Sequence, residues 1–203
     1  MSITLREVRQ AKELRPMLRA LIRDSISCYA DFTQFIHGEL TNIFRDMVRS
    51  CHFFQKQSED QITFHVISQF NTLGFRALHD PQIGGHVDIC IEYDDYLWLA
   101  EAKIHTGYLH LQRGWEQLTS RYSTGMKNED DGAFLIYNFN KKALGVTKEW
   151  RSVLTDFYPD VEIQYEEDEL DFHTVHEHVR SGRRYSVKHY NIPLHHDPKD
   201  REL

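Results

Sequence analysis

Apolar side chains in the first quarter of the chain recur at intervals of three and four residues. This spacing continues from Phe32 to Phe54 and predicts a long amphipathic helix with one buried face. An earlier helix is expected over residues 5–24, interrupted at Pro16 because proline cannot continue the helical hydrogen-bond ladder. We therefore expect residues 1–57 to form an N-terminal helical extension that packs on the rest of the chain.

A second helix and several strand-like segments follow this extension. Ser58 and Gln61 form a capping-box pair that predicts where the helix begins, and Gly74 predicts where it ends. Three segments with strand character come next, at Phe75 to His79, His86 to Glu92 and Tyr96 to Ile104. A helix is then expected over residues 109–123, with Leu111, Trp115, Leu118 and Tyr122 on its inner side.

The apolar run Ala133 to Phe139 does not alternate, which is typical of a central strand buried on both faces. After it, Thr147 is expected to cap a helix that ends before Pro159 and has as its inner stripe Trp150, Val153, Leu154 and Phe157. A last strand is expected at residues 161–165. The order α-β-β-β-α-β-α-β predicts an α/β domain with a mixed sheet over residues 58–194. Residues 195–203 are expected to form a tail.

Composition narrows the class of protein. The chain has 203 residues and is 40% hydrophobic, and it has no apolar run of roughly 20 residues that would span a bilayer. Its three cysteines have no CxxC spacing, which favours a reducing compartment over a disulfide framework. The first residues lack the apolar stretch of a signal peptide. We therefore expect a cytoplasmic protein that does not enter a membrane.

A net charge of −7 argues against nucleic-acid binding, because lysine and arginine normally supply most of the affinity for phosphates. The charge is uneven, however, with an acidic run at residues 166–171 and a basic segment at residues 180–189. In the basic segment, Arg183, Arg184 and Lys188 have two interpretations. They guide a nucleic-acid backbone past an active site, or they form a basic strand that balances the acidic run.

Asp88, Glu101 and Lys103 are the candidate active-site residues. The two-residue period of a strand places Glu101 and Lys103 on one face, and it places Asp88 on the face of its own strand opposite Val87 and Ile89. If the two strands pair, the three side chains meet. Two carboxylates and an ammonium suit metal-assisted phosphodiester hydrolysis, because hard oxygen ligands hold Mg²⁺.

This set resembles the motif of the PD-(D/E)XK nuclease superfamily, which has the restriction-endonuclease-like fold. The core of that fold has the element order α-β-β-β-α-β, and the elements expected over residues 58–139 follow the same order. By resemblance Asp88 corresponds to the first metal-binding aspartate, Glu101 to the acidic residue of (D/E)XK and Lys103 to its lysine. Val87 stands where the family often has proline, and Asp80-Pro81 comes too early to be the "PD".

Three further residues have one functional and one ordinary interpretation. Glu59, at the first turn of its helix, resembles an acidic metal-site residue of many family members, or it is a carboxylate favoured by the helix dipole. Gln117 resembles a glutamine that some members direct at the active site, or it is a boundary residue. Arg121 is a phosphate contact or a surface charge.

The resemblance implies a nuclease that uses Mg²⁺ or Mn²⁺ and attacks phosphodiester bonds with water, with DNA favoured over RNA as the substrate. By family analogy it implies an effector in prokaryotic defence against phage or plasmids. The N-terminal helices are candidates for homodimer or protein-partner contacts. The alternative is a catalytically inactive member of the fold that serves as a binding or assembly module.

The thirteen histidines raise a third hypothesis, a zinc-binding regulatory protein that uses the C-terminal histidines. Their spacing matches no zinc motif and HExxH is absent, so core or solvated histidines are favoured. His86 shares a predicted strand face with Asp88 and is a candidate for supporting the site.

Overall fold

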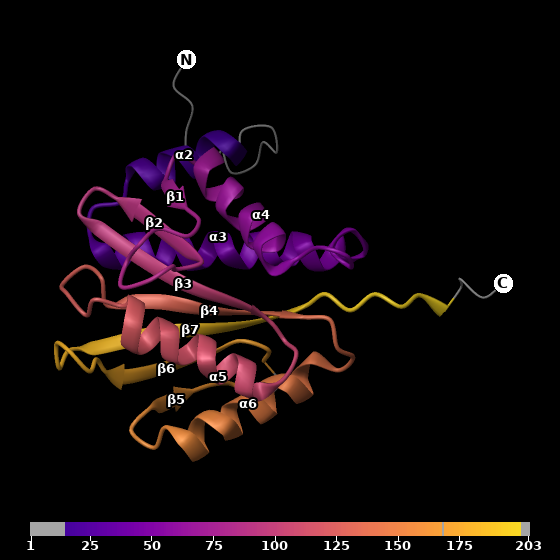
Figure 1. The fold of residues 1–203 in the computed structure, drawn as a ribbon. Helices are drawn as coiled ribbons and strands as arrows, with labels where there is room; N and C mark the ends of the chain where they lie inside the picture. Colours follow the sequence, from indigo (N-terminus) through magenta and orange to yellow (C-terminus); the bar gives the residue numbers. More distant parts are fainter. Residues whose placement is uncertain (1–14, 168, 200–203) are drawn as a thin grey trace.

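The computed structural model describes residues 15–167 and 169–199. A seven-stranded mixed sheet has the strand order β1-β2-β3-β4-β7-β6-β5 and lies between two layers of helices (Figure 1). The predicted α/β class with a mixed sheet is confirmed at this level. The first part of the helix expected over residues 5–24 lies outside the described residues, and its remainder is α2 (Arg15–Asp24).

The first helical layer consists of α2, α3 (Tyr29–Arg49) and α4 (Glu59–Thr72), with a short 3-10 turn at Cys51–Phe53 between the last two. The apolar spacing predicted α3, but the helix ends at Arg49 and does not continue to residue 57. The Ser50 hydroxyl donates to the Asp46 carbonyl at this end, and such a bond competes with the continuing helical ladder. The capping box at Ser58 and Gln61 is formed as predicted and begins α4.

The first three strands form the predicted antiparallel meander, with β1 at Arg76–Leu78, β2 at Ile89–Tyr93 and β3 at Tyr96–Ile104. The second strand begins at Ile89 and not at the predicted His86. Just before it, the Asp88 carboxylate accepts the backbone N–H of Ala102 at 2.9 Å. A side chain therefore continues the inter-strand hydrogen bonding at this point, and the backbone is free to turn away.

The central strand β4 (Asp131–Asn138) runs parallel to β3, and it is buried along almost its whole length, as its apolar run predicted. The second helical layer contains α5 (Tyr108–Glu116), which continues into a π-helical segment, η3 (Gln117–Tyr122), and α6 (Ala143–Phe157). The expected helix over residues 109–123 is therefore present, but its last part has the wider π turn.

Two details predicted for α6 are wrong. The helix begins at Ala143, so Thr147 lies inside it, is buried and donates to the Leu170 carbonyl. Phe157 is 65% exposed and does not belong to the inner stripe. The helical period placed Phe157 inward, but it is the last residue of the helix, where no further turn follows to cover it.

The C-terminal part of the domain holds two strands beyond the last predicted one, and only the second of them was anticipated, as one of two interpretations of the basic segment. The expected last strand is β5 (Glu162–Gln164) at the sheet edge, and it is followed by β6 (Phe172–Glu177) and β7 (Arg184–Pro193). Strand β7 pairs in parallel with β4 and antiparallel with β6. The last strand in the chain therefore lies in the middle of the sheet.

Each face of the sheet has its own apolar core. Buried residues of α3 and α4, among them Phe32 and Phe70, pack on one face together with Trp98. Residues of α5 and α6, among them Trp115 and Trp150, pack on the other. Residues 15–57 thus cover one side of the sheet. Within the described part of the chain, no helix has both the length and the apolar character needed to cross a membrane.

Candidate active site

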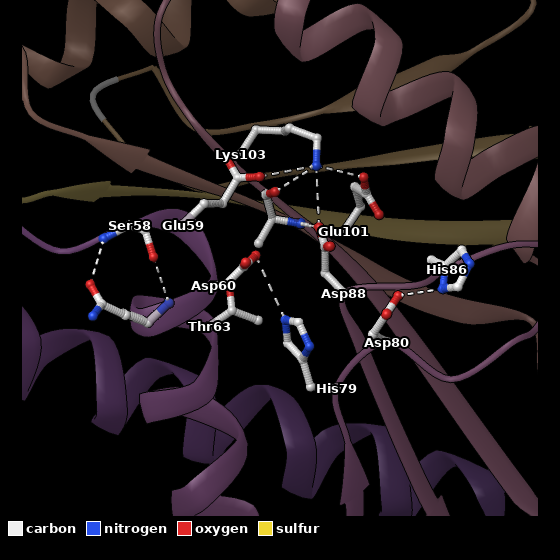
Figure 2. Close-up of polar contacts among 12 residues, drawn as sticks. Ser58, Glu59, Asp60, Thr63, His79, Asp80, His86, Asp88, Glu101 and Lys103 are labelled. Atoms are coloured by element: carbon white, nitrogen blue, oxygen red, sulfur yellow. Dashed lines mark hydrogen bonds and ion pairs between the residues drawn. The ribbon is translucent and has the colours of Figure 1, made fainter.

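Lys103 lies among three carboxylates near the carboxyl end of β3 (Figure 2). Its ammonium nitrogen is 2.7 Å from the Glu101 carboxylate, 3.2 Å from Asp88 and 3.4 Å from Glu59. It also donates to the Ala102 carbonyl at 2.9 Å. The structure thus brings together the three residues that strand periodicity predicted, with Glu59 as the fourth.

Backbone pairing explains why these side chains meet. Glu101 and Lys103 share one face of β3 because side chains alternate along a strand. Strand β2 begins opposite that part of β3, with Ile89 paired to Ala100. Asp88, one residue earlier, is therefore level with Glu101, and its carboxylate reaches the Lys103 ammonium on the same face. The two carboxylate oxygens of Asp88 and Glu101 that bind the ammonium are at most about 6 Å apart, because both contact the same nitrogen.

Glu59 reaches the cluster from a different element. It is the first residue of α4, whose start is fixed by the capping box, and its carboxylate accepts the backbone N–H of Ile104 at 2.6 Å. The same carboxylate faces the Lys103 ammonium and lies 4.0 Å from the His110 imidazole. Glu59 therefore joins the helix layer to the end of β3.

Burial gives Glu101 an unusual electrostatic environment. Its side chain is 2% exposed, and one of its two oxygens has no hydrogen-bond partner. Burial, followed by the neighbouring Asp88 carboxylate, raises the pKa of Glu101 from 4.5 to about 8, although Lys103 opposes this rise. Burial also disfavours the charged form of Lys103, but Asp88 and Glu101 outweigh it and raise the pKa of the ammonium above its usual range. The single ammonium does not balance the negative charge of the surrounding carboxylates, and the lysine stays protonated.

A hollow of about 460 Å³ opens beside Lys103 along α5 and η3. Gln117 and Arg121, both predicted as site residues, line it together with His110, Arg113, Glu116 and Ser120. The Gln117 amide donates to the Tyr122 hydroxyl at 3.2 Å. The structure therefore places Gln117 and Arg121 next to the cluster, although among the described residues no hydrogen bond or ion pair joins either of them to Asp88 or Glu101.

Glycines set how closely this helix approaches the site. A Cβ at Gly114 would lie 2.9 Å from the Lys103 side chain and 3.0 Å from Phe134, so only glycine allows α5 to cross β3 at this distance. A Cβ at Gly84, where φ is +65°, would lie 2.2 Å from the Arg121 carbonyl. These close approaches were not visible in the sequence, because a glycine inside a helical pattern does not indicate what packs on it.

The structure does not bring the basic C-terminal residues to the cluster. Arg183 pairs with Asp130 at 3.1 Å, and Arg184 pairs with Glu162 at 2.7 Å. Through β4, Lys103 is level with residue 191 of β7, seven residues and about 23 Å beyond Arg184 along the strand.

Lys188 lies farther along the same strand. Its ammonium is 4.7 Å from the ring of Tyr190, a side chain that belongs to the core on the α3 face. Lys103, by contrast, contacts α5 on the opposite face of the sheet. The ion pairs of Arg183 and Arg184 and the position of Lys188 favour a structural role for this segment, although Asp130 and Glu162 lie outside the acidic run at residues 166–171 that was expected to balance it.

The histidines occupy core and surface positions. His189 is fully buried, with its ring stacked on Phe172 and hydrogen-bonded to Trp150 and Thr174. His86 pairs with Asp80 at 2.8 Å, on the surface and apart from Asp88. Within residues 15–167 and 169–199, no group of three or more histidine, cysteine, aspartate or glutamate side chains is arranged to hold a metal ion.

The chemistry of the cluster nevertheless suits a hard divalent cation. Mg²⁺ commonly binds through only one or two protein carboxylates, and substrate phosphate and water supply its remaining ligands. Asp88 and Glu101 provide such a pair, and Glu101 has a buried oxygen that lacks a partner. The oxygens of Glu59 are engaged by Lys103 and the Ile104 N–H, so its part in metal binding stays a prediction.

Comparison of the chain with models of protein families, with curated proteins and with solved structures finds no match.

Proposed function

We propose that this chain is a metal-dependent nuclease of the PD-(D/E)XK type, with nucleic acid as its substrate and DNA favoured over RNA. The observation that carries the proposal is the convergence of Asp88 and Glu101 on the buried ammonium of Lys103, beside an open hollow. Ion pairs that only stabilise a fold are usually better satisfied than Glu101, which keeps one unpartnered oxygen.

The order of elements supports the same assignment. Helix α4, the meander β1-β2-β3, helix α5 and strand β4 follow one another as α-β-β-β-α-β, which is the core order of the restriction-endonuclease-like fold. The candidate residues lie at corresponding places: Asp88 before the second strand, Glu101 and Lys103 on the third, and Glu59 on the first helix. We include this fold assignment in the proposal.

In the proposed reaction, a water oxygen attacks phosphorus in line with the leaving oxygen, the bond to that oxygen breaks, and a proton passes to it. Asp88 and Glu101 would hold Mg²⁺ or Mn²⁺, which when bound supplies positive charge against the charge that develops on the phosphate. Lys103 remains an ammonium, so it donates hydrogen bonds to the attacking water or a phosphate oxygen and does not act as the base. Gln117 orients the phosphate from the hollow.

A catalytically inactive binding or assembly module is the second candidate. It is favoured by the position of Lys103, whose ammonium is already paired with three carboxylates, and by the lack of a three-ligand metal set among the described residues. A role in prokaryotic defence follows from either candidate only by family analogy.

The test is to incubate the purified protein with labelled single-stranded and double-stranded DNA and RNA in Mg²⁺, Mn²⁺ or EDTA. We expect cleavage that requires the metal and falls at least about a hundredfold in both site variants. Glu101→Gln weakens the hold on the metal, and Lys103→Met removes the ammonium that donates to the attacking water or a phosphate oxygen. The matched controls are Glu149→Gln and Lys127→Met, two exposed surface positions.

Circular dichroism and thermal unfolding must show that both site variants are folded. Cleavage that survives in folded Lys103→Met would reject the active-site assignment. Metal-dependent binding without cleavage under any of the conditions would favour the inactive module.

A further inference from the structure

Two arginines in the hollow beside Lys103 have no acidic partner among the described residues. Elsewhere in the structure Arg76, Arg183 and Arg184 each pair with a carboxylate. Three other arginines lack such a pair but are engaged by neutral groups: Arg45 donates to Asn42, Arg151 lies over the Tyr165 ring and Arg180 donates to the Ser123 carbonyl. Arg113 and Arg121 both line the hollow, yet no ion pair involves either of them within residues 15–167 and 169–199. In a chain with a net charge of −7, acidic partners are plentiful. Two exposed guanidinium groups left unpaired at one place therefore indicate a site for an external anion.

The one acidic side chain on this wall of the hollow is directed elsewhere. Glu116 lies between the two arginines in sequence, and its carboxylate accepts the Tyr158 hydroxyl at 2.8 Å, on the side of α6. Glu59, the other carboxylate close to the hollow, is engaged by Lys103 and the backbone of β3. Neither carboxylate neutralises Arg113 or Arg121.

Arg121 is held in place by its surroundings. Its Nε donates to the Gly84 carbonyl at 3.3 Å, and a Cβ at Gly85 would lie 3.0 Å from that same nitrogen. The two consecutive glycines let the turn pack directly on η3. A guanidinium anchored through Nε keeps its two Nη groups available, which is the geometry that grips a phosphate with two parallel hydrogen bonds.

The π turn brings the two arginines into line. Arg113 and Arg121 are eight residues apart on the continuous helix formed by α5 and η3. In an uninterrupted α-helix, side chains eight residues apart would differ in direction by about 80°. The π-helical segment has more residues in each turn, which reduces that difference, and both side chains line the same hollow. Their separation along the axis is about 12 Å, more than one phosphate group spans.

We propose that Arg113 and Arg121 form an anion-binding strip that holds the phosphates next to the one at Lys103, so that the substrate class is a polynucleotide strand and not a mononucleotide or another small phosphodiester. The cleavage part of this inference rests on the proposed nuclease function, whereas the binding part does not. The strip begins at the carboxylate cluster and continues along α5 and η3. It therefore sets the path of the strand away from the scissile bond.

The binding test uses the double variant Arg113→Gln/Arg121→Gln of the full chain and a fluorescein-labelled DNA of about twelve nucleotides, followed by anisotropy in EDTA. We expect roughly tenfold weaker binding and a loss of about 1.4 units from the salt slope, since each phosphate contact on a single strand contributes about 0.7. The matched control, Arg183→Gln/Arg184→Gln, removes two arginines that have acidic partners at the other end of the sheet. It should change affinity by less than about twofold.

A small substrate separates the strip from the carboxylate site. Hydrolysis of bis(4-nitrophenyl) phosphate in Mn²⁺ requires only one phosphodiester. We expect the strip variant to lose at least roughly tenfold more of its kcat/KM on the labelled DNA than on this ester. The single variant Arg113→Gln, whose side chain has no hydrogen bond or ion pair in the structure, guards against misfolding of the double variant. This single variant should show about half of the loss in binding free energy that the double variant shows.

The outcomes are distinguishable. If the strip variant binds the labelled DNA as tightly as the wild type, or loses activity equally on both substrates, the strip does not exist, whether or not the protein cleaves. If the wild type never cleaves but the strip variant binds DNA more weakly with a shallower salt slope, the nuclease proposal fails and the strip stands as a nucleic-acid binding site.

Discussion

At the scale of single residues, the cluster around Lys103 combines groups whose charges do not balance. Three carboxylates face one ammonium, and Glu101 is the most buried of them. An arrangement of this kind costs stability in the isolated protein and becomes favourable when a cation or a substrate completes it. The cost is measurable through its dependence on pH.

The first residue-scale prediction concerns Glu101→Gln. The folded protein raises the pKa of this carboxyl from 4.5 to about 8. Between these pH values the Glu101 carboxyl is ionised in the unfolded chain but still protonated in the folded chain. Glu101 therefore lowers the free energy of unfolding as pH rises from about 4.5 to about 8. Glutamine does not ionise, so Glu101→Gln does not undergo this pH-dependent loss of stability. In EDTA it should be more stable than the wild type by on the order of 2 kcal/mol at about pH 8.5, and the difference should disappear near pH 4.5.

Chemical denaturation at several pH values measures this difference. Glu149→Gln is the control, because its carboxylate is exposed on α6, and it should leave the pH profile of stability unchanged. A constant difference between Glu101→Gln and the wild type across the pH range would show that the pKa of Glu101 is not raised.

The sequence predicted the meeting of Asp88, Glu101 and Lys103 because strand alternation is a local rule that two paired strands preserve. It did not predict how the residues are bonded. That Asp88 binds the backbone of Ala102, or that Glu59 binds the backbone of Ile104, depends on the relative placement of separate elements. The pairing of Arg183 with Asp130 is likewise non-local in the sequence.

At the scale of elements, the approach of α5 to β3 determines the shape of the site. Replacing Gly114 by alanine should favour the helix by about 0.5–1 kcal/mol, but the new Cβ would lie 2.9 Å from the Lys103 side chain. We expect stability to change by less than about 1 kcal/mol, because the gain and the crowding offset each other. Metal-dependent cleavage should fall roughly tenfold because the ammonium is displaced.

The control for Gly114→Ala is Gly145→Ala in α6, where a Cβ meets nothing within 4 Å. That variant should gain the helix stabilisation and keep its cleavage rate. Thermal unfolding and a cleavage assay on both proteins make the comparison. If Gly114→Ala cleaves as fast as Gly145→Ala, the close crossing of α5 and β3 has no role in positioning Lys103.

Elements were predictable where their signal is local. The capping box gave the start of α4, and the apolar run gave β4. For the segment that forms β7, a strand was only one of two interpretations because its basic residues also suit contact with nucleic acid, although Tyr185, Val187 and His189 alternate as buried residues on one face. The π turn was missed because the spacing of Trp115, Leu118 and Tyr122 also fits an α-helix.

At the scale of the whole molecule, residues 15–57 cover one face of the sheet and share its core. The boundary predicted at residue 57 separates two parts of the sequence, but Phe32 of α3 packs in the same buried cluster as Trp98 of β3. All three tryptophans lie in the sheet or in the helices of the other face. Their fluorescence therefore reports on the sheet, and Trp98, whose ring lies 5.8 Å from that of His37 in α3, also reports on the contact between the sheet and this helix.

Replacing Phe32 by alanine tests whether the two parts unfold together. The side chain is fully buried, so its loss should cost about 3–5 kcal/mol. Tryptophan fluorescence and far-UV circular dichroism should shift together to the same lower denaturant midpoint. Phe53→Ala, at a position that is 70% exposed, is the control and should change the midpoint little. A shift seen by circular dichroism alone would mean that the helices unfold independently of the sheet.

The position of β7 has a consequence for how the chain folds. Strand β4 pairs with a partner about 55 residues later in the chain, and until that partner arrives β4 has one unpaired edge in the centre of the sheet (Figure 1). Parallel pairing over such a separation is slow to form because the intervening loop must close first. A nascent chain that has emerged only as far as α6 already contains Asp88, Glu101 and Lys103 but lacks the middle of their supporting sheet. During synthesis, the proposed nuclease would therefore become competent only after Pro193 has left the ribosome, so its activity is delayed until the strand that completes its sheet has been made.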